Sequence, residues 1–186
     1  MPQAIELFLD ERADHRIRRI WAALDDHGVT SLGSIPDSRY RPHVTLSVFG
    51  RGNPAEVADA VRPVVAASVG LSLPLASLGF FLTEEAPAFL GVVPSSRLLT
   101  LQRAVHEAVE PLVDDIWPHY RPGALLPHCT LAVGVTDRAR VLDIVTRFPG
   151  QIPARVSSAH LVEIPGGHTS IPLTPAQPAA NGEAGA

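Results

Sequence analysis

Lysine is absent from this chain of 186 residues, so all 15 of its basic residues are arginine. A P-loop needs a lysine that contacts the phosphates of its nucleotide. A pyridoxal phosphate enzyme needs a lysine that forms a Schiff base with the cofactor. The lysyl-nucleotide intermediate of an ATP-dependent ligase needs the same kind of amine nucleophile. The sequence therefore excludes all three classes of enzyme.

Cysteine and long apolar runs are also scarce. Cys129 is the single cysteine of the chain, which rules out an intramolecular disulfide and a cysteine-rich zinc site. No stretch approaches the length of a membrane span. The N-terminal segment has neither the basic region nor the long apolar core of a signal peptide. We therefore expect a cytoplasmic protein with no membrane partner.

The charge balance is acidic, with a formal net charge of −4, while 46% of the residues are hydrophobic. This balance argues against salt-driven coating of long nucleic acids, although a local basic cleft is compatible with it. The apolar content is enough to bury a sizeable core. The length fits one domain, or two small lobes that share a core.

Two short segments share the pattern Pro-His-x-Thr-Leu, at residues 42–46 and 127–131, and each opens an apolar run. Because side chains alternate along a strand, we expect His43, Thr45 and Ser47 on one face of the first strand. The side chains expected on its other, apolar face are Val44, Leu46 and Val48. The motif therefore presents an imidazole beside a hydroxyl, backed by an apolar layer.

The second motif is expected to repeat this arrangement. His128 and Thr130 share one face of their strand, and Cys129 takes the core-facing position that Val44 holds in the first copy. We therefore interpret Cys129 as a core residue and not as a nucleophile.

The predicted elements occur in the same order in both halves of the chain. Hydrophobic periodicity and helix-start signals predict a first half with strands at residues 3–9, 43–49 and 71–82, a helix at 14–27, and a helix that starts at Asn53. They predict a second half with strands at 88–93, 128–134 and 154–164, a helix from about Arg97, and a helix capped by Thr136 that stops near residues 149–150. Each half therefore reads β-α-β-α-β.

Three landmarks give nearly the same offset between these halves. The first strands begin 88 − 3 = 85 residues apart, the motif histidines lie 128 − 43 = 85 apart, and the closing strands begin 154 − 71 = 83 apart. This agreement predicts a structural duplication within a domain at residues 1–164, made of two similar lobes at about 1–82 and 88–164. The two motifs would be related by a pseudo-twofold axis.

Residues 165–186 are rich in Gly, Pro, Ala and Thr and show no periodicity, so we expect a disordered tail. This segment contains a third His-x-Ser match at residues 168–170. It follows Pro165-Gly166-Gly167 and has no strand around it, so we do not interpret it as a functional motif.

Two lobes that meet along the motif strands bring two histidines and two threonines into one cleft. A neutral imidazole can take a proton from the attacking water or hydroxyl, while a protonated one gives a proton to the departing oxygen. Threonine hydroxyls can donate hydrogen bonds to the non-bridging phosphate oxygens. This set of groups suits cleavage of a phosphate ester without a metal ion, with His43 and His128 as the acid–base pair and Thr45 and Thr130 on the phosphate.

The two motifs resemble those of the 2H phosphoesterase superfamily, which includes the bacterial 2′-5′ RNA ligases and the 2′,3′-cyclic nucleotide phosphodiesterases. The family pattern, His-x-Thr/Ser followed by an apolar residue, is met at residues 43–46 and 128–131, and the resemblance covers about 3–164. It implies a bilobal α+β fold with antiparallel sheets that line a central cleft. It also implies hydrolysis of cyclic phosphates, or reversible 2′-5′ joining of RNA ends, without ATP and without a cofactor. We expect a monomer that takes an RNA end or a small cyclic nucleotide as its substrate.

Several residues near the motifs are candidates for substrate binding. Tyr40 and Arg41 precede the first motif, and Arg41 either shares a face with His43 and holds a phosphate or is an exposed loop arginine. Arg121 lies upstream of the second motif beyond a glycine-containing loop. Phe81, next to Phe80, either stacks on a base or packs in the core.

The remaining histidines divide into two groups. His119, beside Trp117 and Tyr120, is a candidate for the rim of the cleft. The histidines without a partner pattern, which we interpret as structural, are His15, His27, His106 and His160.

Two other functions remain open. The chain could be a binding module that holds RNA or a nucleotide in the same cleft without turnover, and the intact motifs count against this. It could also be a metal-dependent hydrolase, but neither motif supplies a second ligand at helical or strand spacing.

Overall fold

The computed structural model, which describes residues 1–167 and 169–175, is built on a seven-stranded antiparallel sheet. Six strands follow the order β2-β1-β8-β4-β5-β7, and β9 adds to β8. These strands are β1 (Gln3–Leu9), β2 (His43–Phe49), β4 (Ser72–Phe80), β5 (Ala88–Val92), β7 (His128–Ala132), β8 (Ile152–Glu163) and β9 (Ser170–Pro172). Two short strands, β3 (Arg51–Gly52) and β6 (Val113–Asp114), form a separate pair that the sequence did not predict.

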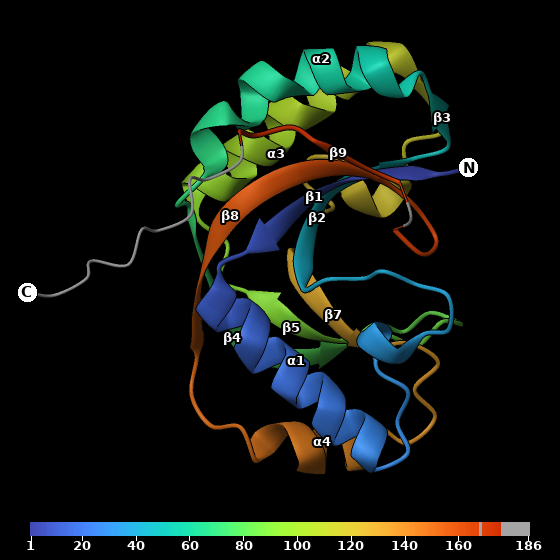
Figure 1. Cartoon of the computed structure of the whole chain (residues 1–186), viewed down its shortest axis with the longest axis vertical. Coiled ribbons are helices and arrows are strands. Elements are labelled where there is room, and N and C mark those ends of the chain that lie inside the picture. Colours follow the sequence, from blue (N-terminus) through green and yellow to red (C-terminus); the bar gives the residue numbers. More distant parts are fainter. Residues whose placement is uncertain (168, 176–186) are drawn as a thin grey trace, which may run out of the picture.

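Four helices cover the sheet in two pairs, α1 with α4 and α2 with α3 (Figure 1). They are α1 (Glu11–Asp26), α2 (Pro54–Val65), α3 (Ser96–Val109) and α4 (Arg138–Thr146). A polar side chain caps the N-terminus of each, and Asn53 does so for α2 as predicted. The cap of α4 is Asp137 and not Thr136, because the Asp137 carboxylate accepts a hydrogen bond from the Arg140 amide at 2.9 Å.

The sheet is strongly curved, and the curvature brings the two motif strands together. β2 and β7 are the two ends of the hydrogen-bonded path, yet they contact each other in the middle of the molecule (Figure 1). The α+β class and the antiparallel sheet are as expected. The curved sheet therefore places His43 and His128 in the same region.

The closing strands of the two halves are exchanged. β1 pairs with β8, through Gln3 and Glu163 among others, while β4 pairs with β5, through Gly79 and Phe89. β8 is long enough, at 12 residues, to pair with both β1 and β4. Each half of the sheet is thus completed by a strand from the other half of the chain, which sequence order alone did not indicate.

The first part of the expected disordered tail is ordered. β9 pairs with β8 through Ile171 and Leu161, Leu173 is 3% exposed, and the Thr174 hydroxyl accepts a hydrogen bond from the Ala159 amide at 3.1 Å. The prediction of disorder is therefore wrong for residues 169–175, because two apolar side chains in a proline-rich context suffice to add an edge strand. His168, in the third motif match, and residues 176–186 lie outside the described residues.

One apolar core joins the sheet to all four helices. Leu7, Ile17, Leu98 and Ile144, which come from four different elements, are almost completely buried in it. In the part of the chain that the structure describes, no helix is both long and apolar enough to cross a membrane.

Candidate active site

His43 and His128 stand at the first positions of β2 and β7, and their rings are held in the same way. The His43 Nδ1 atom lies 2.7 Å from the Arg41 carbonyl oxygen, and the His128 Nδ1 atom lies 2.7 Å from the Leu126 carbonyl oxygen. Since a carbonyl only accepts, Nδ1 carries the proton in both rings. The tautomer is therefore fixed, and Nε2 is left for proton transfer in each ring.

Both rings line a single cleft of about 600 Å³, which we call the two-histidine cleft. Thr45 and Thr130 line the same cleft, so the structure brings the four residues of the two motifs together as the sequence predicted. His43 and Thr45 are 8% and 9% exposed. A group that enters the cleft thus meets two imidazoles and two hydroxyls.

A β-bulge in β2 changes which side chains follow Thr45 into the cleft. Glu6 of β1 pairs with Thr45 but Ile5 pairs with Ser47, so Leu46 is skipped. After the skipped residue the alternation is reversed: Val48 lines the cleft, and Ser47 is buried outside its lining. The prediction that Ser47 shares a face with His43 is wrong, because one extra residue inverts the period-two pattern.

Cys129 lies on the core side of β7, as expected. Its side chain is 1% exposed, and burial raises the pKa of its thiol to about 12. The thiol therefore stays protonated and unreactive at neutral pH.

Glu6, on β1, is a buried carboxylate beside His43 that the sequence analysis missed. Its side chain is 6% exposed, and its Oε1 atom lies 3.4 Å from the His43 Nε2 atom. Burial raises the pKa of Glu6, and positive charge on His43 opposes this rise. The available signal was a lone acid between Ile5 and Leu7, in a strand whose other residues apart from Gln3 are apolar.

Tyr120 is a second residue that the motifs did not reveal. Its backbone carbonyl accepts a hydrogen bond from the buried Gln102 Nε2 at 2.6 Å, which fixes the segment before the second motif. Burial, assisted by the negative charge of Glu6 and opposed by a hydrogen bond to Thr45, raises the pKa of the Tyr120 phenol to about 12. Tyr120 therefore presents a protonated hydroxyl to the cleft beside Thr45.

Aromatic rings surround His128. The Phe81 ring meets the His128 ring edge-on, with 4.9 Å between centroids, and the Phe89 ring lies at 5.3 Å. Burial lowers the pKa of His128, the hydrogen bond to the Leu126 carbonyl opposes this, and charge on His43 lowers it further. At neutral pH His128 is therefore held in its neutral form.

The other candidates for substrate binding are divided between the cleft and its surroundings. Tyr40, Phe81 and His119 line the cleft, and the Tyr40 ring lies roughly parallel to the His43 ring at 6.3 Å. The Tyr40 hydroxyl also accepts a hydrogen bond from the Gly166 amide at 2.8 Å. Arg121 is exposed and lies outside the cleft lining.

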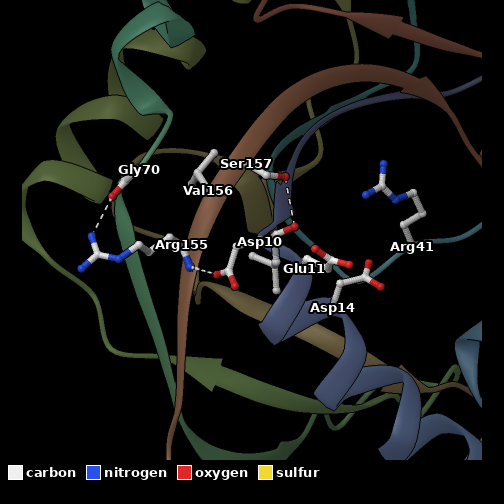
Figure 2. A pocket seen from close by; sticks show the side chains of 9 residues that line it. Asp10, Glu11, Asp14, Arg41, Gly70, Arg155, Val156 and Ser157 are labelled. Atoms are coloured by element: carbon white, nitrogen blue, oxygen red, sulfur yellow. Dashed lines mark hydrogen bonds between the residues drawn. The ribbon is translucent and has the colours of Figure 1, made fainter. Parts of the chain in front are cut away.

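The Arg41 side chain turns away from the two-histidine cleft. Its carbonyl faces the His43 ring, whereas its guanidinium lies 4.5 Å from the centre of the Phe8 ring. It lines a different hollow, together with Glu11, Asp14 and Arg155 (Figure 2). Of the two interpretations of Arg41, the structure agrees with the exposed loop arginine and not with a residue on the His43 face, because Arg41 precedes the strand and does not follow its alternation.

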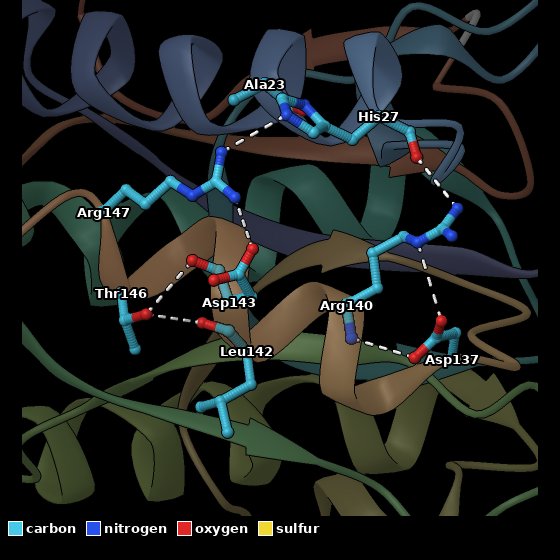
Figure 3. Close-up of polar contacts among 8 residues, drawn as sticks. All are labelled: Ala23, His27, Asp137, Arg140, Leu142, Asp143, Thr146 and Arg147. Carbon is cyan, nitrogen blue, oxygen red and sulfur yellow. Dashed lines mark hydrogen bonds and ion pairs between the residues drawn. The ribbon is translucent and has the colours of Figure 1, made fainter.

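His27 makes structural contacts, as interpreted. Its Nδ1 donates to the Ala23 carbonyl at 2.8 Å, and its Nε2 accepts from Arg147 at 3.3 Å, while its carbonyl accepts from Arg140 at 3.3 Å (Figure 3). These bonds tie the end of α1 to α4. His160 is likewise held by two hydroxyls, those of Ser158 and Ser170. Across residues 1–167 and 169–175, no three His, Cys, Asp or Glu side chains gather into a set that could hold a metal ion.

Residues 9–168 match the family model of the 2′-5′ RNA ligase superfamily, which is the superfamily that the two motifs resemble. The chain belongs to this superfamily. Its fold agrees with the assignment, because the structure is similar to solved structures of members and relatives over most of its length.

One similar structure is a phosphoesterase, with a TM-score of 0.57 and 17% identity over 91% of this chain and 93% of that chain. Another is E. coli LigT in complex with NADP+, with a TM-score of 0.56 and 16% identity over 91% of this chain and 92% of that chain. E. coli LigT in complex with 3′-AMP is similar with a TM-score of 0.51 and 15% identity, over 91% of this chain and 92% of that chain. At such identities the likeness concerns the fold. No protein of curated function matches the sequence significantly.

Proposed function

We propose that this member of the superfamily is a metal-independent phosphoesterase that acts on 2′,3′-cyclic phosphates or 2′-5′ phosphodiester linkages of RNA or nucleotides. The observation that carries the proposal is that the two imidazole rings have the same tautomer and line the same cleft. Each donates a hydrogen bond from Nδ1–H to the carbonyl two residues earlier and lines the same cleft, with Nε2 left for chemistry.

The reaction is an in-line displacement at phosphorus. One imidazole takes a proton from water as the water oxygen bonds to phosphorus, and the ring bond from phosphorus to the 2′ or 3′ oxygen breaks. The other imidazole gives its proton to that departing oxygen, so the product is a phosphate monoester beside a free hydroxyl. Joining of RNA ends is the same step in reverse, with a hydroxyl in place of water.

The hydroxyls of Thr45 and Thr130 are the donors for the two non-bridging phosphate oxygens, because each follows its histidine by two positions on the same strand face. The protonated Tyr120 hydroxyl lies beside Thr45 and adds a third donor. Hydrogen bonds from neutral hydroxyls match the single negative charge of a cyclic phosphate or a phosphodiester.

The walls of the cleft suit a nucleoside. Phe81, Tyr40 and Trp117 line it, and Trp117 is 43% exposed and therefore available for stacking. LigT has been crystallised with 3′-AMP and with NADP+, which makes nucleotides the first class of ligand to test here.

The test is incubation of the protein, in EDTA, with a short RNA that ends in a 2′,3′-cyclic phosphate. We expect ring opening, and a loss of about 10²- to 10⁴-fold in kcat/KM for His43→Ala and for His128→Ala. His15→Ala is the matched control, since His15 is exposed on α1 and outside the cleft lining. Binding of the RNA without turnover would instead identify a binding module, and loss of turnover in EDTA that added metal restores would identify a metal-dependent hydrolase.

A further inference from the structure

We infer that Glu6 is a positioning residue that makes the two histidines unequal, with His43 as the general acid and His128 as the general base. This inference rests on the proposed phosphoesterase reaction, which by itself leaves the two roles unassigned. The symmetric Nδ1 contacts of the two rings do not distinguish them. The two rings differ in the residues that face them from the neighbouring strands, β1 beside β2 and β5 beside β7.

The duplication places a carboxylate beside one motif and an aromatic ring beside the other. Thr45 pairs with Glu6 on β1, and Thr130 pairs with Phe89 on β5. Both registers shift immediately before this pair, because Ile5 pairs with Ser47 and Ala88 pairs with Ala132. The β-bulge is therefore duplicated, and Glu6 and Phe89 occupy equivalent positions in the two halves.

The two neighbours have opposite effects on a proton. The Glu6 Oε1 atom lies 3.4 Å from the His43 Nε2 atom, and a carboxylate at this distance stabilises an imidazolium. The Phe89 ring lies 5.3 Å from the His128 ring and provides no counter-charge. Burial in this aromatic surrounding lowers the pKa of His128, and positive charge on His43 adds to the effect. The His43 ring is thus set to give a proton and the His128 ring to accept one.

The other titratable groups around Glu6 do not replace His43 as its partner. On β8, the cross-strand neighbour of Glu6 is His160, whose ring nitrogens are engaged by Ser170 and Ser158 at 2.8 and 3.1 Å. Tyr120 faces Glu6 as a neutral phenol. Burial raises the pKa of Glu6, and positive charge on His43 opposes this rise, so a proton on His43 favours the negative charge of Glu6.

In the hydrolytic step, His128 Nε2 takes the proton of the attacking water and the new bond to phosphorus forms. The bond to the departing oxygen breaks, and His43 Nε2 gives that oxygen its proton. Water therefore enters on the β7 side of the cleft and the leaving oxygen faces β2. Between turnovers the His43–Glu6 pair takes up a proton from solvent, and His128 releases one.

The first experiment compares the pH profile of kcat/KM for the parent protein, Glu6→Gln and Glu6→Asp, with a nucleoside 2′,3′-cyclic phosphate as substrate. We expect Glu6→Gln to move the basic limb of the profile to lower pH by about one unit, so that activity on the basic side of this limb falls about tenfold while activity on the acidic side changes little. Glu6→Asp restores part of the shift. The control is Glu85→Gln, which removes the same charge from an exposed position of the cleft lining and leaves the basic limb where it is.

The second experiment assigns the roles with a phosphodiester whose leaving group is 4-nitrophenolate, which departs without a proton. We expect His43→Ala to retain within about tenfold of the parent activity on this substrate, while His128→Ala loses about 10²- to 10⁴-fold. The reverse pattern would overturn the assignment. A uniform loss at every pH for Glu6→Gln would reduce Glu6 to a structural residue.

NMR titration of the two imidazole rings without substrate keeps the inference separate from the proposed function. The His43 ring should lose its proton at lower pH in Glu6→Gln than in the parent, and an unchanged titration would overturn the inference even where turnover is present. If the parent turns over none of these substrates, the proposed function fails, while the ring titration still decides whether Glu6 governs the proton on His43.

Discussion

Replacement of Gly79 by alanine tests how firmly the aromatic pair behind His128 is fixed. Gly79 on β4 lies opposite Phe89 on β5, and the Phe89 ring covers it. A Cβ atom at Gly79 would lie 2.4 Å from the Phe89 Cζ atom and 2.6 Å from its Cε2 atom. The same ring packs on Phe81, at 4.3 Å between centroids, and on His128 at 5.3 Å.

The size of the effect follows from this overlap. Ordinary carbon contacts begin at 3.4 Å, so the Phe89 ring must retreat by 3.4 − 2.4 = 1.0 Å. Overpacking of this kind costs about 1–3 kcal/mol, and the lower backbone entropy of alanine offsets about 0.5–1 kcal/mol. We expect the free energy of unfolding to fall by about 1 kcal/mol. A shift of this size passed on to His128 reduces kcat/KM by up to about 10²-fold.

The first assay is urea unfolding, in which the midpoint concentration should fall while the m-value stays unchanged. The second is NMR of the His128 ring, whose chemical shifts report the positions of the two phenyl rings. In a double-mutant cycle, Phe89→Leu should remove most of the cost of Gly79→Ala, with a coupling energy above about 0.5 kcal/mol. A Gly79→Ala protein as stable as the parent, with unmoved His128 signals, would refute the reasoning.

Three other substitutions give expectations of different kinds. Cys129→Val places one more methyl group in the packed core, so the free energy of unfolding should fall by about 1–3 kcal/mol. The native parent should resist iodoacetamide, because burial raises the pKa of this thiol to about 12. Burial lowers the pKa of His128 below 6.5 in the folded state, so the unfolded chain binds more protons at this residue as the pH falls. The free energy of unfolding of the parent should therefore decrease relative to that of His128→Gln as the pH falls through 6.5. If urea titrations at several pH values gave the two proteins the same dependence of this free energy on pH, the prediction would be contradicted. Asp25→Ala should lower the free energy of unfolding, measured by heat or urea, by about 1–3 kcal/mol. The reason is that the Asp25 carboxylate accepts hydrogen bonds from the amide and the hydroxyl of the fully buried Ser31, at 2.8 and 2.9 Å. As the control, replacement of its exposed neighbour in Asp26→Ala should change the free energy of unfolding by no more than about 0.5 kcal/mol.

The motif strands and the order of elements were accessible from the sequence because their signals are local. Alternation of polar and apolar side chains starts at His43 and at His128, and the offset of 85 residues between them recurs at the first strands. Asn53, followed by Pro54 and Glu56, is a local signal in the same sense, and α2 starts there.

The errors arise where the outcome depends on a partner strand. Nothing in residues 43–49 shows that β1 skips Leu46, and this skip decides that Val48 and not Ser47 enters the cleft. Glu6 is conspicuous in its strand, but its contact with His43 exists only once β1 has paired with β2. The exchange of β4 and β8 is likewise a matter of long-range pairing, which hydrophobic periodicity does not encode.

This exchange of closing strands determines when the molecule can be completed during synthesis. Gln3 pairs with Glu163, so β1 leaves the ribosome long before β8, which becomes one of its two neighbouring strands. In that interval β1 can pair with β2 but its other edge stays open, and pairing across such a separation is slow. A nascent chain stalled before β8 therefore exposes the apolar edge of β1 that β8 covers in the finished fold.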